Sequence, residues 1–321
     1  MLLFSDLHLR DETADVVLGQ VLPGLRAEMN RLGEHHAVCL GDVFHIRNRV
    51  DVALINGLRD ELLRWSGIFL DILPGNHDQY TVDGRHALEY LADILDPCGG
   101  AVRVHSEPGW DGTGFWMPYR KDPWALAKVE GRGRTLFAHL PFKGAMLAAN
   151  QVDTDGLDGM ALGGWAYVFA GHYHMHQQIP GFIQGWYVGS PYQVSAGEAG
   201  QVKGFVQWDG RAAPVFHARR WGPCYHVLAV QKGGDLDLSN VRAGDEVRVL
   251  AASGVNVASV AQALRTVGVR HTVTPEVDHV ESRLAVGAGA SLTEYARSYV
   301  EAQAGELDKA QLMALFETVT R

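Results

Sequence analysis

The chain has 321 residues, 47% hydrophobic and 20% charged, with a formal net charge of −9. This is the composition of an ordinary globular protein, and no apolar run approaches the ~20 residues of a membrane-spanning helix. The acidic balance disfavours DNA binding through a basic surface alone, although bound divalent cations would add positive charge locally. No basic segment precedes the first apolar residues, so we expect no signal peptide and no membrane association.

Short apolar runs recur in the first half of the chain, with helical patterns between them. Runs this short and this uniformly apolar predict strands buried on both faces: Met1–Phe4, Ala37–Leu40, Ile68–Leu73, Thr135–Ala138 and Tyr167–Ala170. The helical patterns cover Ala14–Leu32, with an expected interruption at Pro23 and Gly24, then Asp51–Trp65 and Arg85–Leu95. The alternation predicts an α/β fold, a layered β-sandwich flanked by helices.

The pattern changes after about residue 180. Phe182–Val188 and Gly204–Trp208 predict strands of a second, more antiparallel sheet. Three domains follow from these changes: residues 1–218, a small α/β domain at 224–284, and C-terminal helices at 290–321. The small domain is predicted to have strands near 225–231, 246–251 and 270–274 and a helix at Val257–Val267. Ser291 followed by Glu294 is typical of a capping box at a helix start.

Three cysteines are present, Cys39, Cys98 and Cys224, far apart and without a CxxC pair. An odd number of widely spaced cysteines indicates reduced thiols rather than a disulfide framework. We therefore expect a cytoplasmic protein, in a bacterial cell or in an infected host cell if the gene is carried by a phage.

Polar side chains stand at the ends of the five predicted strands. Ligands gather at the carboxyl ends of strands in α/β folds, so these side chains are expected to converge: Asp6, His8, Asp42, Asn76, His77, His139, His172 and His174. Carboxylates, imidazoles and an amide suit Mn²⁺, Fe²⁺ or Zn²⁺, and the absence of a thiolate disfavours a structural zinc site. Each motif alone is common in proteins without a metal site, whereas the ordered set predicts a dinuclear centre that Asp42 could bridge.

The ordered set resembles the signature of the calcineurin-like metallophosphoesterases, over residues 1 to about 215. The resemblance implies that Asp6, His8 and His174 bind one metal and that Asp42 bridges to a second. It also implies that Asn76, His139 and His172 bind the second metal, and that His77 is a catalytic proton donor.

Two further strings are similar to the SbcD / Mre-eleven type of nuclease. His45 stands three residues after Asp42, where protein phosphatases place an acidic residue, and it is a second catalytic candidate that orients His77 or contacts phosphate. Gly189-Ser190-Pro191-Tyr192-Gln193, then Gly197-Glu198 and Lys203-Gly204-Phe205, resemble a run in phage nuclease subunits such as the T-even recombination endonuclease.

This resemblance implies a Mn²⁺-dependent DNA nuclease, a 3′→5′ exonuclease and endonuclease of repair and recombination, with Mg²⁺, Fe²⁺ or Zn²⁺ as alternative metals. It further implies a homodimer with its face near residues 85–95, where the alternative is that these side chains belong to the core. It also implies a coiled-coil ABC ATPase of the SbcC type held by residues 290–321, where the alternative is that the apolar stripe of these helices packs within the chain itself. Residues 224–284 would steer DNA. A phosphatase or phosphodiesterase acting on a phosphoprotein or small nucleotide is the alternative, and a scaffold with a vestigial site is a third.

Contacts to the substrate phosphate are less constrained by the sequence. Backbone amides at Gly189 and Ser190 could hold a phosphate, or the same residues could form a tight turn around a packed Tyr192. The leading cationic candidates are Arg47, Arg49 and Arg85. Further candidates are Arg120, Lys121, Arg132, Arg134 and Lys143.

Overall fold

The computed structural model describes residues 1–45, 49, 51–81, 84–89, 101–122, 126, 129, 133–148, 151–275, 291–303 and 308–319. The chain forms two compact units. One comprises Met1–Val227, Leu238–Arg248 and Ala263–His271, and the other comprises Leu228–Asp237, Val249–Gln262 and Thr272–Arg321. Within the described ranges, no helix has the length and apolarity needed to cross a membrane.

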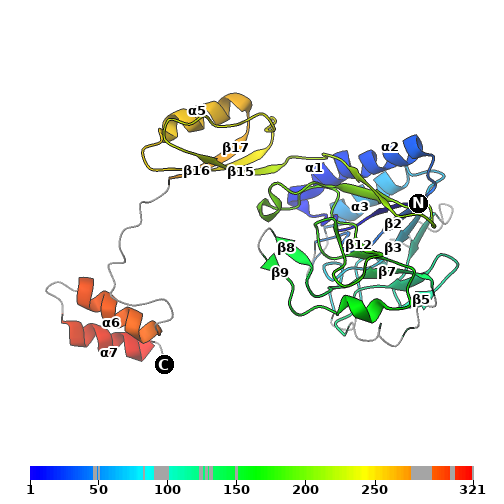
Figure 1. The fold of residues 1–321 in the computed structure, drawn as a ribbon, viewed down its shortest axis with the longest axis horizontal. Helices are drawn as coiled ribbons and strands as arrows, with labels where there is room; N and C mark the ends of the chain where they lie inside the picture. Colours follow the sequence, from blue (N-terminus) through cyan, green and yellow to red (C-terminus); the bar gives the residue numbers. More distant parts are fainter. Residues whose placement is uncertain are drawn as a thin grey trace. The chain divides into compact units, whose positions relative to one another are not determined.

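The first unit contains two six-stranded sheets (Figure 1). In the first sheet, the order is β14-β13-β1-β2-β3-β4, with β1 to β4 mutually parallel and β13 antiparallel to β1. The strands are β1 (Leu2–Phe4), β2 (His36–Cys39), β3 (Phe69–Ile72), β4 (Val102–Val104), β13 (Gly204–Gln207) and β14 (Val215–Ala218).

The second sheet has the order β11-β12-β10-β7-β6-β5, and its inner strands β12, β10, β7 and β6 are parallel. Its strands are β5 (Gly109–Trp110), β6 (Phe115–Met117), β7 (Thr135–His139), β10 (Tyr167–Gly171), β11 (Gln177–Gln178) and β12 (Gly185–Tyr187). A separate hairpin joins β8 (Met146–Ala148) to β9 (Gln151–Val152).

The apolar side chains form three buried clusters that explain this arrangement. One cluster contains Leu3 and Val38 from the first sheet together with Phe137 and Phe169 from the second, so the two sheets face each other across it. A second cluster lies between the first sheet and the helices, and a third contains the other face of the second sheet. The mixed α/β class is confirmed, and the strands are buried on both faces as predicted.

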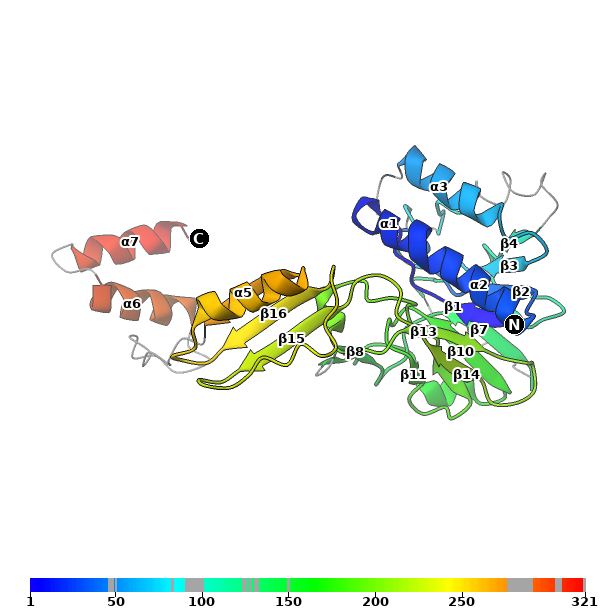
Figure 2. The same ribbon diagram turned by 90° about the horizontal axis from the view of Figure 1, so that it is seen from above.

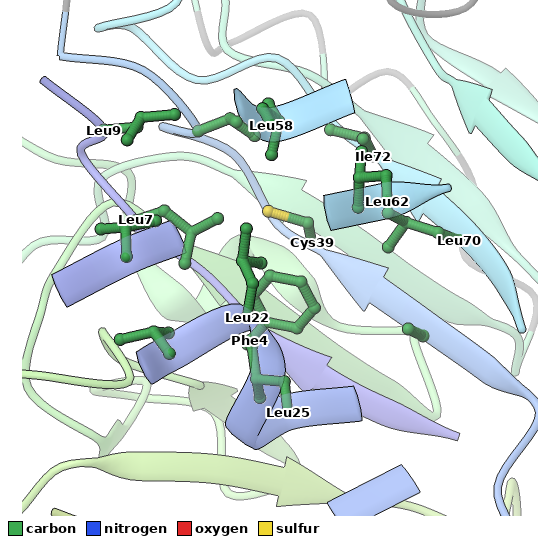
Figure 3. Close-up of a cluster of buried hydrophobic side chains, with 14 of the residues drawn as sticks. Phe4, Leu7, Leu9, Leu22, Leu25, Cys39, Leu58, Leu62, Leu70 and Ile72 are labelled. Atoms are coloured by element: carbon green, nitrogen blue, oxygen red, sulfur yellow. The ribbon is translucent and has the colours of Figure 1, made fainter. Parts of the chain in front are cut away.

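Two helices, α2 (Leu22–Leu32) and α3 (Val52–Leu62), cover the outer face of the first sheet (Figure 2). Their leucines point at the side chains of β1, β2 and β3, and Figure 3 shows this packing: Leu22, Leu25, Leu58 and Leu62 around Phe4, Cys39, Leu70 and Ile72. α3 begins as predicted, because the Asp51 carboxylate accepts a hydrogen bond from the Ala53 amide at 2.7 Å.

Pro23 and Gly24 do not interrupt the first helical segment, contrary to expectation. α1 (Ala14–Val16) runs through a π-helical turn at Val17–Val21 into α2, and Pro23 lies in the first turn of α2. Proline has no N–H to donate, and the wider π turn directly before it accommodates the missing bond. Gly24 is required for packing, since an added Cβ would lie 2.4 Å from Trp221 Nε1.

Two other expectations differ from the structure. Arg85 to Leu88 are not helical, and residues 90–95, including the rest of the expected dimer face, lie outside the described residues. The strands predicted at Phe182–Val188 and Gly204–Trp208 do not share a sheet: β12 pairs parallel with β10, and β13 pairs antiparallel with β1. Both strands are apolar and each joins a different buried sheet, so the chain between them crosses from the second sheet to the first.

The C-terminal elements lie close to their predicted bounds. β15 (Tyr225–Val230), β16 (Glu246–Ala251) and β17 (Arg270–Pro275) form one sheet in that order, and α5 (Val257–Val267) connects the last two. α6 (Leu292–Gln303) packs against α7 (Lys309–Val319). Ser291 and Glu294 exchange backbone-to-side-chain hydrogen bonds at 2.7 and 3.3 Å, which confirms the capping box. Cys39 and Cys224 are free thiols, and Cys98 is outside the described residues.

Candidate metal centre

The structure brings the predicted ligands to one edge of the two facing sheets. Asp6 and His8 follow β1, Asp42 follows β2, and Asn76 follows β3, all in the first sheet. The remaining histidines come from the second sheet, at the end of β7 and just after β10: His139, His172 and His174. Parallel strands in both sheets end at this edge, and this is why residues up to 168 positions apart can meet.

One group of side chains is formed by Asp6, His8 and His174, whose potential ligand atoms all lie within 4.8 Å of one another. His8 Nε2 is 2.9 Å from His174 Nε2, and His174 Nε2 is 3.9 Å from Asp6 Oδ1. Two imidazole nitrogens and a carboxylate oxygen therefore point at a common position. We call this group the Asp6 half-site.

A second group is formed by Asn76, His139 and His172, which we call the Asn76 half-site. Asn76 Oδ1 lies 3.1 Å from His139 Nε2 and 2.9 Å from His172 Nδ1. The other ring nitrogen of His139 is 2.6 Å from the Leu40 carbonyl oxygen, so Nδ1–H donates there and Nε2 is left to face Asn76.

Asp42 lies between the two half-sites. Its Oδ2 atom is 3.7 Å from His8 Nε2 and 3.5 Å from His139 Nε2, while its Oδ1 atom accepts a hydrogen bond from the His77 amide at 2.8 Å. Asp42 also groups with Asp6 and His139 as a potential metal-binding set. One carboxylate is thus in reach of ligands from both groups.

The backbone at these positions is unusual. Among the described residues, the non-glycine residues with positive φ are Asp6, His8, Asp42 and His172, at 56°, 46°, 52° and 97°. The left-handed region costs a non-glycine residue roughly 1–2 kcal/mol. All four belong to the predicted ligand set, so the local strain is concentrated at the candidate centre.

Two motif glycines allow the loops to approach this closely. A Cβ atom on Gly41 would lie 2.2 Å from His139 Nδ1, and one on Gly75 would lie 2.1 Å from Asp42 Oδ1. Neither position can accept a larger residue without displacing the side chain of a candidate ligand. The glycines of the two motifs are therefore needed for the geometry of the centre.

The charges of the centre follow from its burial and from the charges of neighbouring side chains. Burial raises the pKa of Asp6, whereas neighbouring His139 and His8 hold the pKa of Asp42 well below its usual range despite burial. Burial would lower the pKa of His139, but Asp42 beside it raises that pKa to about 9. Burial, reinforced by His139, lowers the pKa of His172 to about 3. Asp42 is thus anionic and His172 neutral, the forms in which these groups bind cations, whereas His139 would have to release a proton to bind one.

His45 and His77, the predicted catalytic pair, lie beside His8. Their rings stack with centroids 4.5 Å apart and planes at 16°, and His8 meets the His77 ring edge-on at 4.9 Å. His45 Nδ1 is 2.8 Å from His8 Nδ1. Both imidazoles therefore lie at the Asp6 half-site.

Asp78 holds together the two loops that carry this pair, a function not predicted from the sequence. Its carboxylate accepts hydrogen bonds from the amides of Val43, Phe44 and Gly75 at 3.3, 2.8 and 2.8 Å. Burial and the nearby Asp42 raise the pKa of Asp78 to about 7. The only sequence signal was its place in Gly75-Asn76-His77-Asp78, where it follows the candidate catalytic histidine.

Glu198 and Lys203 hold the side chain of His174 in position. Neither residue has a role predicted from the sequence. His174 Nδ1–H donates to Glu198 Oε1 at 2.7 Å, and Lys203 Nζ lies 2.6 Å from Glu198 Oε2. Both residues are buried. Their signal was their place in the second nuclease-like string.

The predicted phosphate contacts are placed less uniformly. Ser190 is 1% exposed, its amide donates to the His174 carbonyl, and its hydroxyl donates to the Tyr192 carbonyl at 2.9 Å. These contacts favour the alternative interpretation, a tight turn around packed Tyr192. Arg49 lines a hollow of about 490 Å³ together with Arg10 and His45.

The other cationic candidates lie on the surface or outside the described residues. Arg85 is exposed and bonds Glu89 at 3.3 Å, and Arg120 donates to the Ser106 carbonyl at 2.7 Å. Arg134 lies over the Trp110 ring, and Lys121 and Lys143 are exposed. Arg47 and Arg132 lie outside the described residues.

Comparisons with known proteins add little to this geometry. No protein-family model matches the chain, and no curated protein matches it. Among solved structures, the nuclease MPE of Pseudomonas putida is similar over 66% of this chain and 86% of its own length, at 15% identity and a TM-score of 0.31. At this level the similarity assigns neither a fold nor an activity to the chain.

Proposed function

We propose that the chain is a two-metal phosphodiesterase acting on DNA, a nuclease of the SbcD / Mre-eleven type among the calcineurin-like metallophosphoesterases. The observation that carries the proposal is the position of Asp42, a buried carboxylate within 3.7 Å of a histidine from each half-site. A bridging carboxylate between two sets of oxygen and nitrogen donors is what a pair of divalent cations requires.

The side chains present fit such a pair. The Asp6 half-site offers a carboxylate and two imidazoles, and the Asn76 half-site offers an amide oxygen and two imidazoles. This is a borderline donor set without thiolate, suited to Mn²⁺, with Mg²⁺, Fe²⁺ and Zn²⁺ as alternatives. When bound, two cations would neutralise charge on the phosphate oxygens and lower the pKa of an attacking water.

The protein's own residues would handle orientation and the leaving group. His77 would donate a proton to the departing alkoxide, a task that requires an imidazole beside the phosphate. His45, stacked on His77 at 4.5 Å, would fix the orientation of that ring. Asp78 would keep both in register through the amides of the two loops.

The finer features of the proposal rest on the sequence resemblance. They are 3′→5′ exonuclease and endonuclease activity, Mn²⁺ dependence, a cytoplasmic role in repair or recombination, a homodimer, and a partner ATPase of the SbcC type. Residues 224–284 would steer DNA to the metals, and residues 290–321 would bind the ATPase.

A phosphatase or phosphodiesterase for a phosphoprotein or small nucleotide is the second candidate. The net charge of −9 favours it, as does the internal bonding of Arg120 and Arg85, since neither feature builds a basic track for DNA. Such an enzyme would use the same metal centre with a smaller substrate.

The two candidates are separated by competing substrates. Purified protein with Mn²⁺ is incubated with end-labelled single- and double-stranded DNA, with a cyclic nucleotide and with a phosphoserine peptide. The nuclease proposal expects DNA to be cleaved fastest, and the end label reports the polarity. Faster turnover of the peptide or the cyclic nucleotide would establish the second candidate instead.

A further inference from the structure

The two half-sites receive different support from the surrounding protein. In the Asp6 half-site, His174 donates Nδ1–H to the carboxylate of Glu198 at 2.7 Å. In the Asn76 half-site, His139 donates Nδ1–H to a neutral backbone carbonyl, that of Leu40, at 2.6 Å. A carboxylate behind a ligating imidazole fixes its tautomer and makes it a stronger ligand than a carbonyl does.

Glu198 is held in place by a buried cation. Lys203 is 5% exposed, and its Nζ atom lies 2.6 Å from Glu198 Oε2. The same Nζ donates to the carbonyl of His174 at 2.8 Å and to Ser190 Oγ and Gln201 Oε1 at 2.9 Å. Lys203 therefore fixes both the carboxylate behind His174 and the backbone of His174 itself.

A second contact orders the Glu198 carboxylate. Its Oε2 atom also accepts a hydrogen bond from the Val194 amide at 3.1 Å. Burying a lysine and a glutamate is costly unless each finds several partners, and here both do. A buried ion pair of this kind adds little to the stability of the fold, but it holds His174 in a fixed position.

The half-sites also differ in charge. The Asp6 half-site contains a carboxylate of its own in addition to Asp42, whereas the corresponding oxygen donor of the Asn76 half-site is a neutral amide. More ligand charge gives tighter binding of a divalent cation. The carboxylate of Glu198 behind His174 and the extra ligand charge of Asp6 thus both favour tighter cation binding at the Asp6 half-site.

We infer that Glu198 and Lys203 are positioning residues that make the Asp6 half-site the tighter of the two cation sites, so that it fills first. The inference rests on the dinuclear centre of the proposed function, but it does not depend on the substrate. It predicts two separable binding events, of which only the tighter one responds to Glu198 and Lys203.

The test is a calorimetric titration of the metal-free full-length chain with MnCl₂. For Glu198→Gln we expect the tighter event to weaken by about 10–100-fold and the weaker event to stay unchanged. Lys203→Met should act in the same direction. In an Asn76→Ala background, which removes a ligand of the weaker half-site, Glu198→Gln should weaken the event that remains.

The matched control is Glu61→Gln on α3. Glu61 is also a buried carboxylate, 2% exposed, paired with Arg26 at 3.2 Å and Arg64 at 2.9 Å, but it lies among none of the ligands. It should lower stability without changing Mn²⁺ affinity. If Glu198→Gln does not fold, as judged by circular dichroism, Glu198→Asp replaces it and should weaken the tighter event less.

The outcomes separate this inference from the proposed function. Unchanged affinities in Glu198→Gln, or a loss confined to the weaker event, would overturn the inference. A wild-type chain that binds no Mn²⁺ would overturn the inference and the metal centre together. Suppose that two binding events are seen, that Glu198→Gln weakens the tighter one, and that the protein cleaves no DNA. This result would support the inference and contradict only the proposed nuclease activity.

Discussion

His77 is the side chain whose proposed catalytic role can be tested apart from metal binding. Its amide anchors Asp42, but its imidazole stacks on His45 beside the Asp6 half-site. For His77→Ala we expect Mn²⁺ binding close to that of wild type and a loss of turnover of about 10²–10⁴-fold, the usual contribution of a general acid. Calorimetry and cleavage of labelled DNA measure the two quantities.

The competing interpretation is that His77 is itself a ligand, since it groups with His8 and His45 as a potential metal-binding set. In that case His77→Ala would lose a binding event along with its activity. Turnover equal to that of wild type, with equal metal content, would exclude the proton-donor role.

The convergence of the candidate ligands could be predicted from the sequence because each one follows a short apolar run. Strand ends on one edge converge whatever the details of the loops, so spacing alone brought Asp6, Asp42 and Asn76 together. Asp78, Glu198 and Lys203 could not be assigned in this way, because their roles depend on which backbone amides and side chains the folded loops present to them. The positive φ angles could not be predicted from the sequence either. Aspartate and histidine have no preference for the left-handed region comparable to that of glycine.

Two glycines of the first helical segment provide a test at the scale of the element. Gly19 has no atom within 4 Å of a potential Cβ, so Gly19→Ala should stabilise the fold by about 0.5–1 kcal/mol through helix propensity. At Gly24 the added methyl meets the Trp221 ring at 2.4 Å, and Gly24→Ala should instead destabilise by about 1–3 kcal/mol. Urea denaturation measures both, and equal stabilisation would refute the packing of Trp221.

Asp71 on β3 provides a pH-dependent test. The buried carboxylate accepts hydrogen bonds from His36 Nε2 and His105 Nε2, both at 2.7 Å. Burial would raise its pKa, but these bonds and the nearby Arg103 hold the pKa below the usual 3.8. Because the folded pKa is the lower one, the contribution to stability is complete above about pH 4 and is lost as the pH falls through the folded value.

Asp71→Asn should therefore lower the free energy of unfolding by about 1–3 kcal/mol at pH 7 and flatten its decline in acid. Asp60→Asn is the control, since Asp60 is 55% exposed and pairs only with neighbouring Arg59 in the hydrogen bonds and ion pairs of the described residues. Denaturation from pH 3 to pH 7 measures both variants. An acid limb in Asp71→Asn as steep as that of wild type would contradict the assignment.

The strands were easier to predict than the sheets that they form. Uniformly apolar runs located β1, β2, β3, β7 and β10 within a residue or two, because burial on both faces leaves no other pattern. The same signal cannot say which sheet a strand joins, so β12 and β13 were placed together although they lie in different sheets. Partner choice is set by long-range packing, here by the cluster containing Leu3, Phe137 and Phe169.

For the whole molecule, the net charge of −9 implies that the proposed binding of DNA depends on bound cations. Two divalent cations would add about four positive charges where the phosphates arrive. We expect chelation with EDTA to weaken binding of a short DNA by about tenfold or more, and added Mn²⁺ to restore it. Fluorescence anisotropy with the His77→Ala variant measures binding without cleavage. Equal affinity in EDTA would mean that the protein's own cations suffice.

The left-handed backbone at Asp6, His8, Asp42 and His172 has a consequence for attempts to improve the protein. A screen for heat resistance favours substitutions that relieve local backbone strain, and glycine or asparagine at these positions would relieve it. Each such replacement would also delete or exchange a donor for a cation. Laboratory evolution that selects on melting temperature alone should therefore yield proteins with a higher melting temperature that have lost the proposed metal centre.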